Sequence, residues 1–532
     1  MNKRKSENIL EGTMLRSDIL DRLDTDTTWD MIIIGGGATG LGCGVDAAGR
    51  GYKTLLLEAH DFSQGTSSRS TKLVHGGVRY LQQGNVALVM DALHERGVLL
   101  RNAPHLVYNQ AFVVPDYKWW ERPFYGVGLK LYDMLAGKLG FGRSRILSRS
   151  KTLNMIPNLE PTDLRGGVIY YDGQFDDSRL AITLAKTMQD LGGLPVNHMG
   201  VSALLKDGEG LISGVEARDA LTGKTRRLRA RTVINATGVF VDDILRMDDV
   251  NAPKLIAPSQ GIHLVLDKSF SPGDTAIMVP HTDDGRVIFL VPWHGRVLVG
   301  TTDVALDTPD HEPRPREEEI AFLLEHAGRY LTRDPKRSDI LSIFAGIRPL
   351  IRAEGEDKTS SLSRDHHLTI SQSGLVTIAG GKWTTYRKMG EDTVTQAARF
   401  AGLPAHSCKT ENLPLHGWMN GLDPRDHLSV YGSDIEEIRE MIRRDPELGK
   451  PLHYKLPYLR AEVVWAVRRE WARTLSDVLR HRTRALILDA SVSMIIARDV
   501  AEIMALELDQ GKDWIEEQVG SFRELARDYL AG

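Results

Sequence analysis

Three glycines and one acidic residue near the start of the chain have the types and the spacing of a dinucleotide-binding site. Gly35, Gly37 and Gly40 follow the apolar run 31–34, and Glu58 stands about 20 residues further on. In such a motif the first glycine allows a tight turn, the second lets the backbone approach a pyrophosphate, and the third lets a helix pack closely on a strand. The acid can accept hydrogen bonds from ribose hydroxyls. A glycine-rich packing turn without a ligand is the alternative interpretation.

A strand–turn–helix–strand unit must position these residues, because phosphates bind to the free N–H groups at the start of a helix. The pattern predicts this unit over residues 30–60, with a helix over 38–50 that ends at Gly51. Two later apolar runs, 231–238 and 375–382, predict further strands of the same sheet.

The segments between those strands predict a second sheet. Residues 287–292 and 296–300 are typical of two strands joined by a short turn, and a helix is expected over 383–397. One nucleotide domain is therefore expected to be interrupted by segments that form a mixed, mainly antiparallel sheet. Such a sheet would form a substrate domain that caps the cofactor domain.

Three features favour FAD over NAD as the dinucleotide. Gly44 extends the glycine motif to a close-packing variant, and the hydroxyls of 66–70 follow the second strand, where they could bind a pyrophosphate. The turn 235–238 ends a buried strand, as expected where backbone approaches another part of a long cofactor. Each feature alone could be an ordinary turn.

A further glycine turn, 379–387, places the start of a helix directly after a strand. A helix start carries roughly +0.5 charge, so near the flavin pyrimidine it would stabilise the negative charge of the reduced ring. The alternative is a simple strand–helix connector that is capped by Thr384 or Thr385.

Composition excludes several classes of protein. The net charge of −4, from 67 basic and 71 acidic residues among 532, gives no global nucleic-acid signature. Two cysteines, Cys43 and Cys408, allow neither a disulfide framework nor a cysteine metal cluster, and no metal site is expected. No apolar run approaches the ~20 residues that span a bilayer, and the polar N-terminus makes a secretory signal unexpected.

Several blocks together resemble the FAD-dependent, respiratory glycerol-3-phosphate dehydrogenases of the D-amino-acid-oxidase-like group. The resemblance covers about residues 28–400, and the helical tail also looks like that family's C-terminal domain. The matching blocks are 34–37, 46–51, 66–68, 72–81, 291–293, 300–303, 346–350 and 380–388.

The resemblance implies an α/β fold with a Rossmann-like FAD-binding domain, an interleaved antiparallel-sheet substrate domain and a C-terminal all-helical domain. In this division 1–28 is an extension with a short helix near 18–23, 29–408 is the oxidoreductase and 409–532 is the helical domain. The expected FAD-binding segments are about 29–105, 165–260 and 340–408. Apolar residues at helical spacing over 462–479 predict one helix whose stripe packs in the core.

The motifs and the resemblance together name the site residues. The expected cofactor-binding residues are Gly35, Gly37, Thr39, Gly40, Glu58, Thr66, Ser67, Ser68, Lys72, His75, Gly76, Ala236, Gly238, Gly381, Lys382 and Thr384. The substrate implied is sn-glycerol 3-phosphate, whose dianionic phosphate needs fixed cations. The expected substrate-binding residues are Arg79, Tyr80, His263, Arg348, Arg364 and Lys382. His366 departs from the family pattern, which has a tyrosine there.

The expected reaction oxidises the C2 alcohol to dihydroxyacetone phosphate by hydride transfer to the flavin. The catalytic residues are expected to be His263, as the base that takes the hydroxyl proton, and Arg348, which could stabilise the developing alkoxide. A histidine that only binds the substrate is the alternative for His263, and His75 is a weaker candidate base. Arg348 is not a candidate base, because its pKa exceeds 12.

The family's dehydrogenases pass electrons to a membrane quinone, whereas its oxidases use O₂ and carry an insertion that is not evident here. We therefore expect a dehydrogenase that is peripheral to the inner membrane, on its cytoplasmic face, and a homodimer is one assembly open to it. The aromatic and basic segment 117–132 suits an interfacial helix, although a helix packed on the substrate domain would have the same pattern. A glycerol-phosphate oxidase, a flavin amine oxidase and a non-catalytic FAD sensor are the alternatives.

Overall fold

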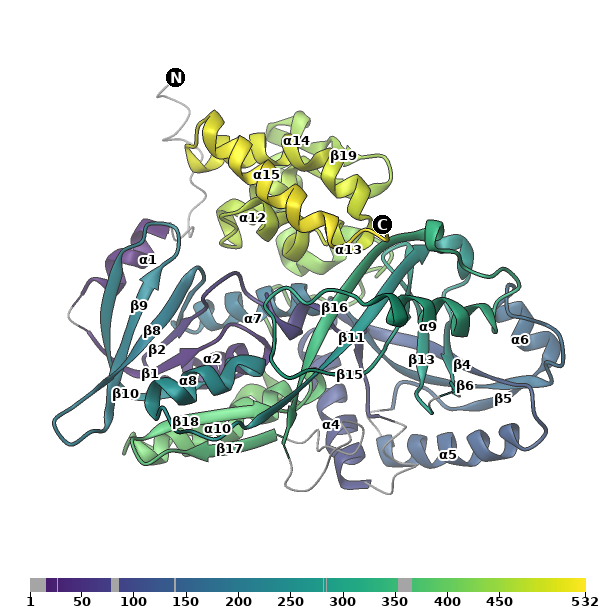
Figure 1. Ribbon diagram of the computed structural model, residues 1–532, viewed down its shortest axis with the longest axis horizontal. Coiled ribbons are helices and arrows are strands. Elements are labelled where there is room, and N and C mark those ends of the chain that lie inside the picture. The colour runs from purple at the N-terminus through teal and green to yellow at the C-terminus, as the bar shows by residue number, and fades with distance from the viewer. Residues whose placement is uncertain are drawn as a thin grey trace.

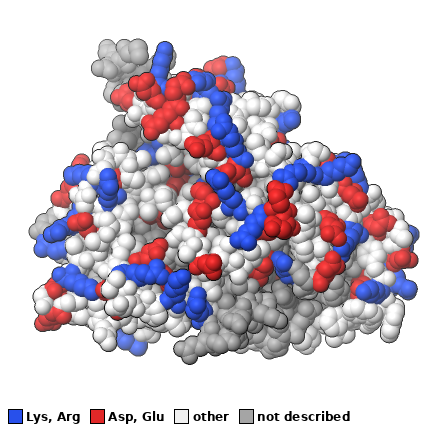
Figure 2. Space-filling model, viewed as in Figure 1, with Lys and Arg blue, Asp and Glu red and all other residues white. Residues whose placement is uncertain are grey.

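The computed structural model describes residues 16–25, 27–77, 86–137, 140–280, 282–283, 285–352 and 366–532. Two sheets lie side by side, and a group of helices from the C-terminal part of the chain covers one end of both (Figure 1). Acidic and basic side chains are interspersed over the face that Figure 2 shows. No helix of the described residues is both long and apolar enough to cross a bilayer.

The first sheet contains the predicted dinucleotide-binding strands. Its order is β17-β18-β10-β1-β2-β7, and every neighbouring pair is parallel except the edge pair β17–β18. The bounds are β1 Thr28–Ile34, β2 Thr54–Leu57, β7 Leu194–Val196, β10 Thr225–Asn235, β17 His366–Ile370 and β18 Leu375–Gly380, with the hairpin β8 Met199–Lys206 and β9 Ile212–Asp219 attached to β10. The expectation that strands from three distant parts of the sequence belong to one sheet is confirmed, and β1, β10 and β18 are parallel.

The helices of this half pack tightly because glycines allow close contact. Helix α2 (Ala38–Gly49) lies between α7 (Asp177–Asp190) and α10 (Tyr386–Phe400). A Cβ on Gly390 would lie 2.6 Å from the backbone of Gly42, so two backbones meet where α2 crosses α10. Helix α8 (Val241–Asp248) and α1 (Arg16–Leu23) complete this half. The predicted helices 38–50 and 383–397 agree with α2 and α10 within a few residues.

The second sheet is mixed and mainly antiparallel, as predicted. Its order is β15-β11-β14-β13-β12-β4-β6-β3, with β16 on β11 and β5 on β6. The bounds are β3 Leu73–Val74, β4 Val107–Asp116, β5 Arg145–Ser148, β6 Gly166–Phe175, β11 Ile256–Asp267, β12 Ala276–Val279, β13 Ile288–Trp293, β14 Arg296–Gly300, β15 Val304–Ala305 and β16 Ile340–Ile351. Helices α4 (Val86–Asn102), α5 (Glu121–Ala136), α6 (Arg149–Met155) and α9 (Glu317–Gly328) flank it.

The C-terminal part is helical apart from one short hairpin. Its elements are α11 Ile435–Arg444, β19 Pro451–His453, β20 Leu456–Leu459, α12 Arg460–Arg469, α13 Ala485–Leu488, α14 Ala490–Leu508 and α15 Lys512–Arg527. The expectation of one helix over 462–479 is wrong, because α12 ends at Arg469 and a π-helical turn follows over Asp477–Arg482. The chain turns at Glu470, whose buried carboxylate accepts two hydrogen bonds from Arg179 at 2.7 and 2.8 Å.

The contact between Gly40 and the turn at Gly35 supplies a direct test of the fold. A Cβ on Gly40 would lie 1.9 Å from the carbonyl oxygen of Gly35, whereas one on Gly49, at the end of the same helix, would meet nothing closer than 3.7 Å. We expect Gly40→Ala to lower the thermal midpoint strongly, because backbone must move. Gly49→Ala is the matched control and should keep or raise it, since alanine is favoured over glycine in helices by about 1 kcal/mol. Equal midpoints for the two variants, measured by circular dichroism, would contradict this packing.

Candidate cofactor and substrate site

Two adjoining cavities lie where the two sheets meet. The first has a volume of about 370 Å³ and lies at the carboxyl ends of β1, β2, β10 and β18, and the second has about 560 Å³ and lies on the second sheet. The residues that line both cavities are Thr66, Pro349, Gly381, Lys382 and Trp383. A ligand in the first cavity can therefore extend into the second past the Gly381–Trp383 turn.

The glycine turn and the start of α2 form the floor of the first cavity. Gly37 is the residue at the N-terminus of α2 and, as a glycine, has no side chain of its own to cap the helix. Its neighbour Ala38 donates its N–H to Ser67 Oγ at 2.9 Å, which fixes the loop beyond β2 against the helix. Gly35 has a φ of +108°, and a Cβ there would lie 2.6 Å from the carbonyl oxygen of Ala236. Small residues thus leave room for a phosphate group at the helix start.

Glu58 lines the first cavity and is already oriented by the backbone. Its two carboxylate oxygens accept hydrogen bonds from Gly36 N at 2.6 Å and His60 N at 2.8 Å. Burial raises the pKa of Glu58, and these two donors oppose the rise. Each carboxylate oxygen can accept more than one hydrogen bond, so Glu58 can also bind the hydroxyls of a ribose.

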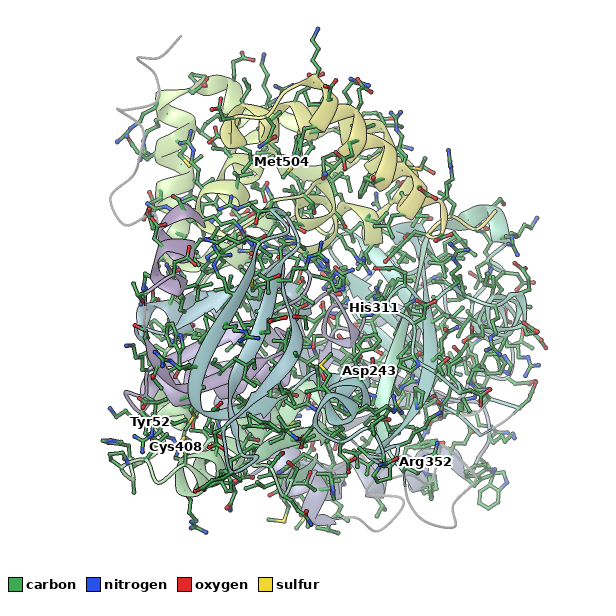
Figure 3. The ribbon with its side chains drawn as sticks, turned by 60° about the vertical axis from the view of Figure 1, so that its left-hand side comes forward. Tyr52, Asp243, His311, Arg352, Cys408 and Met504 are labelled. Carbon is green, nitrogen blue, oxygen red and sulfur yellow. The ribbon has the colours of Figure 1, made fainter. Side chains whose placement is uncertain are left out.

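Two further groups that line the first cavity had no role in the sequence analysis. His311 stacks on Phe240, with ring centroids 4.0 Å apart and planes 15° apart. Asp243 of α8 lies beside them in the cavity wall, and Figure 3 shows both His311 and Asp243 in the middle of the molecule, below the helix that carries Met504. The loop that holds His311 has no periodic pattern, so the sequence carried no signal for it.

Four of the expected cofactor residues lie behind the cavity surface instead of lining it, and these are Gly40, Ser68, Lys72 and Gly76. Lys72 is fully buried, where its Nζ donates to Asp177 Oδ2 at 2.7 Å and to Ser68 O at 2.9 Å. Burial lowers the pKa of Lys72 to about 8, although Asp177 opposes the shift. The Lys72 side chain therefore stabilises the loop after β2 from the protein interior and does not reach the cavity.

Arg348 provides a fixed cation in the wall of the second cavity. It lies on β16 opposite Ser259 of β11, and the guanidinium donates to Thr301 Oγ1 at 3.1 Å and to Thr302 O at 2.9 Å. Asp303 lies 3.3 Å from the guanidinium, so the charge is partly balanced within the protein. Lys382 lines the same cavity from the end of β18. The two cations therefore approach it from different sheets.

His263 lies deep in this cavity and is held on three sides. Its Nε2 is 2.9 Å from Thr71 Oγ1, and its ring stacks on Phe344 with centroids 4.8 Å apart. Gly300 of β14 is directly opposite, where a Cβ would lie 2.2 Å from the ring. Burial, followed by the charges of Lys72 and Arg348, lowers the pKa of His263 well below its usual value. The imidazole is therefore neutral at pH 7.

The remaining expected residues divide into three groups. Arg79, Tyr80 and Arg364 lie outside the described residues. His75 and Thr384 line the second cavity, and the backbone N–H of His75 donates to Thr384 Oγ1 at 3.3 Å. Thr39, Ala236 and Gly238 line the first cavity. His366, which departs from the family pattern, lines neither cavity: it lies on the edge strand β17 opposite Gly380 and pairs with Asp392 at 3.2 Å.

The sequence analysis also missed residues of the second cavity. Thr301 and Asp303 belong to a matched block, but they were given no role, although both touch Arg348. Arg286 lines the same cavity and packs on Phe322, with its guanidinium 4.9 Å from the ring centroid. A single arginine beside a glycine turn has no pattern that separates it from a surface residue, so only the fold identifies it.

The chemistry of the two cavities fits FAD. The first offers an open helix start for the pyrophosphate and an oriented carboxylate for a ribose, as dinucleotide sites do. The passage at Gly381–Trp383 would let the flavin ring of a bound FAD reach the second cavity. Arg348, Lys382 and His263 line that cavity. The residues present thus provide a cofactor site next to a cationic pocket.

Comparison with known proteins gives the same result. Residues 30–387 match the family described as FAD dependent oxidoreductase, and 408–515 match the C-terminal domain of alpha-glycerophosphate oxidase. The mitochondrial glycerol-3-phosphate dehydrogenase of Homo sapiens is 41% identical over 96% of this chain and 74% of its own length. That of Schizosaccharomyces pombe is 36% identical over 97% of this chain and 89% of its own.

Solved structures agree. The glycerol-3-phosphate dehydrogenase from Bacillus halodurans, complexed with FAD, has a TM-score of 0.79 and 29% identity over 97% of each chain. The L-alpha-glycerophosphate oxidase from Mycoplasma pneumoniae has a TM-score of 0.56 and 18% identity over 73% of this chain and 98% of its own, which shows a shared fold. The family match over most of the chain, the identity to curated relatives and the paired cavities lead to one conclusion: this chain belongs to the FAD-dependent glycerol-3-phosphate dehydrogenases.

Proposed function

We propose that this chain oxidises sn-glycerol 3-phosphate to dihydroxyacetone phosphate and passes the electrons to a membrane quinone. One observation carries the proposal: the cavity that holds Arg348 and Lys382 opens directly onto the cavity that fits FAD. FAD, when bound, supplies the hydride acceptor for this chemistry. The relatives' names support the choice of substrate.

The cations of the larger cavity suit a phosphate that carries nearly two negative charges at pH 7. Arg348 can offer a planar pair of donors, and Lys382 adds a point charge from the other sheet. Arg286 is a third cation in the same wall. Arg79 and Arg364, which the family resemblance matches, are proposed to complete the phosphate site.

His263 is proposed as the base that accepts the proton of the C2 hydroxyl. A neutral imidazole can take up this proton, whereas an imidazolium could not, and the lowered pKa of His263 keeps it neutral. The ring cannot swing away, because Thr71 and Phe344 hold it. Arg348 is proposed to stabilise the alkoxide as the proton leaves, without itself exchanging a proton.

Anaerobic bleaching of the holoenzyme tests the reaction and the substrate together. We expect sn-glycerol 3-phosphate to abolish the visible flavin absorbance, because oxidation of the alcohol reduces the cofactor. Glycerol at the same concentration should leave it unchanged, since it lacks the phosphate. A protein that binds no flavin, or that bleaches equally with glycerol, would contradict the proposal.

The variant Arg348→Met extends this test to the phosphate site. A charge-assisted hydrogen bond is worth about 1.5–3 kcal/mol, so the half-saturating concentration should rise at least about tenfold. Arg296→Met is the matched control, because Arg296 lies on β14 of the same sheet but lines neither cavity. An unchanged half-saturating concentration in Arg348→Met would remove Arg348 from the substrate site.

The variant His263→Asn tests the proposed base. The first-order rate of anaerobic flavin reduction by the substrate, followed by stopped flow, should fall about 100-fold or more. In the wild type this rate should not fall with acid until the pH is well below 6.5, because a lowered pKa delays protonation. His105→Asn is the control, since His105 is a buried histidine outside both cavities. A rate that stays at the wild-type value would assign the proton to another group, and His75 would be examined next.

The second cavity also has an apolar half that a small polyol does not use. Its lining there consists of Phe112, Trp120, Phe124, Tyr125, Met278 and Phe289. A three-carbon phosphate needs no such surface, whereas the ring and chain of a quinone bind to one. We therefore propose this half as the place where the acceptor reaches the reduced cofactor. The oxidase alternative needs no apolar surface, and peroxide formation measured against quinone reduction separates the two.

Helix α5 gives the same region an exposed apolar face. One face of the helix packs inward through Tyr125 and Leu129, but Phe124, Val127 and Met134 are 52%, 71% and 77% exposed. The basic side chains Lys118 and Lys130 stand beside this face, and Trp119 is 76% exposed just before the helix. Aromatic and apolar side chains flanked by lysines suit the interface of an anionic bilayer.

We propose that α5 docks the enzyme on a membrane surface. The helix lies at the edge of the molecule away from the C-terminal helices (Figure 1), so docking would leave the latter in water. The relatives' names place those proteins in mitochondria and do not name a membrane. The cytoplasmic face expected above has no support in these names.

Flotation with liposomes that contain anionic lipid tests this docking. The triple variant Trp119→Ala/Val127→Ser/Met134→Ser should lose most binding, because it removes the apolar area that would enter the interface. The control Ile495→Ser/Leu506→Ser changes two residues of α14 that are 64% and 82% exposed and should still float. Flotation of the triple variant at the wild-type level would exclude α5 as the docking surface.

A further inference from the structure

The segment 477–484 of the C-terminal part is buried against the rest of the protein, and the proposed function gives it no role. The side chains of its charged residues are almost fully enclosed: Asp477, Arg480, His481, Arg482 and Arg484 are at most 2% exposed. Burial of so many charges is tolerated only where each has a partner. Their partners therefore show what this segment holds in place.

Arg484 reaches the loop that follows β2. Its Nη2 donates to the carbonyl oxygen of Ser68 at 2.8 Å and to Asp177 Oδ1 at 2.9 Å. The other oxygen of Asp177 accepts from Ser70 Oγ and Lys72 Nζ, each at 2.7 Å. Arg484 thus holds the loop directly at Ser68 and indirectly, through Asp177, at two further residues.

Arg480 holds the same loop from its other side. Its guanidinium donates to both oxygens of Glu312, at 2.7 and 2.9 Å. Glu312 in turn accepts from Gln64 Nε2 at 2.7 Å and from Arg69 Nη2 at 2.8 Å. Two arginines four residues apart in the sequence therefore hold, directly or through Glu312 and Asp177, the ends and the middle of the segment 64–72.

The segment 64–72 is the wall between the two cavities. Thr66 and Ser67 line the cavity that fits FAD, and Ser67 fixes the start of α2. Ser70 and Thr71 line the substrate cavity, and Thr71 holds His263. Small shifts of this loop would therefore change the cofactor site and the substrate site together.

No described residue after Thr384 lines either cavity. We propose that Arg480 and Arg484 are positioning residues, and that the C-terminal domain acts on the reaction by clamping the segment 64–72 between the two cavities. The inference rests on the proposed function, because it takes the first cavity as the FAD site. It gives the C-terminal domain a role in cofactor retention and substrate binding without any contact to either molecule.

Arg484 bonds through both ends of its guanidinium, because Nη2 donates to Ser68 O and Asp177 Oδ1 while Nη1 donates to the carbonyl oxygen of Arg480 at 2.9 Å. Lysine can place its single nitrogen at only one of these two ends. Loss of Arg484 leaves Asp177 paired with Lys72 and Ser70, so no carboxylate is left without a partner. A variant at Arg484 should therefore fold, with a loosened loop.

Release of FAD from the holoenzyme measures the clamp. In Arg484→Met the dissociation rate, followed by the rise of flavin fluorescence, should increase at least about tenfold, which corresponds to about 1.4 kcal/mol. The KM for sn-glycerol 3-phosphate should rise as well, with a smaller change in kcat, because the reacting groups are still present. Arg484→Lys should recover part of the loss, and Arg480→Met should change the same two quantities in the same direction.

Arg482→Met is the matched control. Arg482 belongs to the same segment and is equally buried, but its guanidinium pairs with Asp61 and with the carbonyl of Glu470 and does not touch 64–72. It should lower the thermal midpoint at least as much as Arg484→Met, while FAD release and KM stay near the wild-type values.

Equal rates of FAD release in Arg482→Met and Arg484→Met would overturn the inference. The effect would then come from weaker packing of the C-terminal part in general, and not from the contact with 64–72. Wild-type release and KM in Arg484→Met would overturn it as well. These outcomes leave the proposed function intact if the wild type is still bleached by the substrate. A wild type that holds no FAD would overturn both.

Discussion

The buried carboxylate of Asp177 holds the loop that borders both cavities, because it accepts hydrogen bonds from Ser70, Lys72 and Arg484. It is fully buried at the start of α7, and it binds Lys72 of the loop after β2 and Arg484 of the C-terminal part. Three pieces of chain that are far apart in sequence are thereby joined at one point. If either cation were lost the carboxylate would keep the other, but loss of the carboxylate would take a buried partner from both cations.

The sequence predicted those parts of the fold in which local pattern and tertiary structure agree. Around Gly37 the residue types and the hydrophobic period both indicate a strand, a glycine turn and a helix. The structure has these elements there. The helix expected over 462–479 was wrong because Glu470 pairs with Arg179, almost 300 residues earlier, and the chain bends to make that pair. Periodicity within a window cannot detect such a partner.

The same limit applies to the candidate site. Arg348 and His263 were identified because they stand in recognisable motifs, and the structure places both in one cavity. Lys72 stands in a motif too, but its side chain is used in an ion pair behind the cavity wall. Arg286 and His311 lie in loops without a pattern, and only the folded chain brings them to the cavities. Spacing identifies a motif residue, but it does not tell which way its side chain points.

The order of strands in the first sheet has a consequence for synthesis. Strand β1 ends at Ile34, but its neighbour β10 begins at Thr225, and β18, the next strand along, begins at Leu375. At about 5–20 residues per second, the ribosome needs roughly 20–70 seconds to make the chain between the first and the last of these strands. One edge of β1 has no partner until β10 is made, and one edge of β10 then has none until β18 is made. The first sheet therefore cannot be complete before β18 (Leu375–Gly380) has been made.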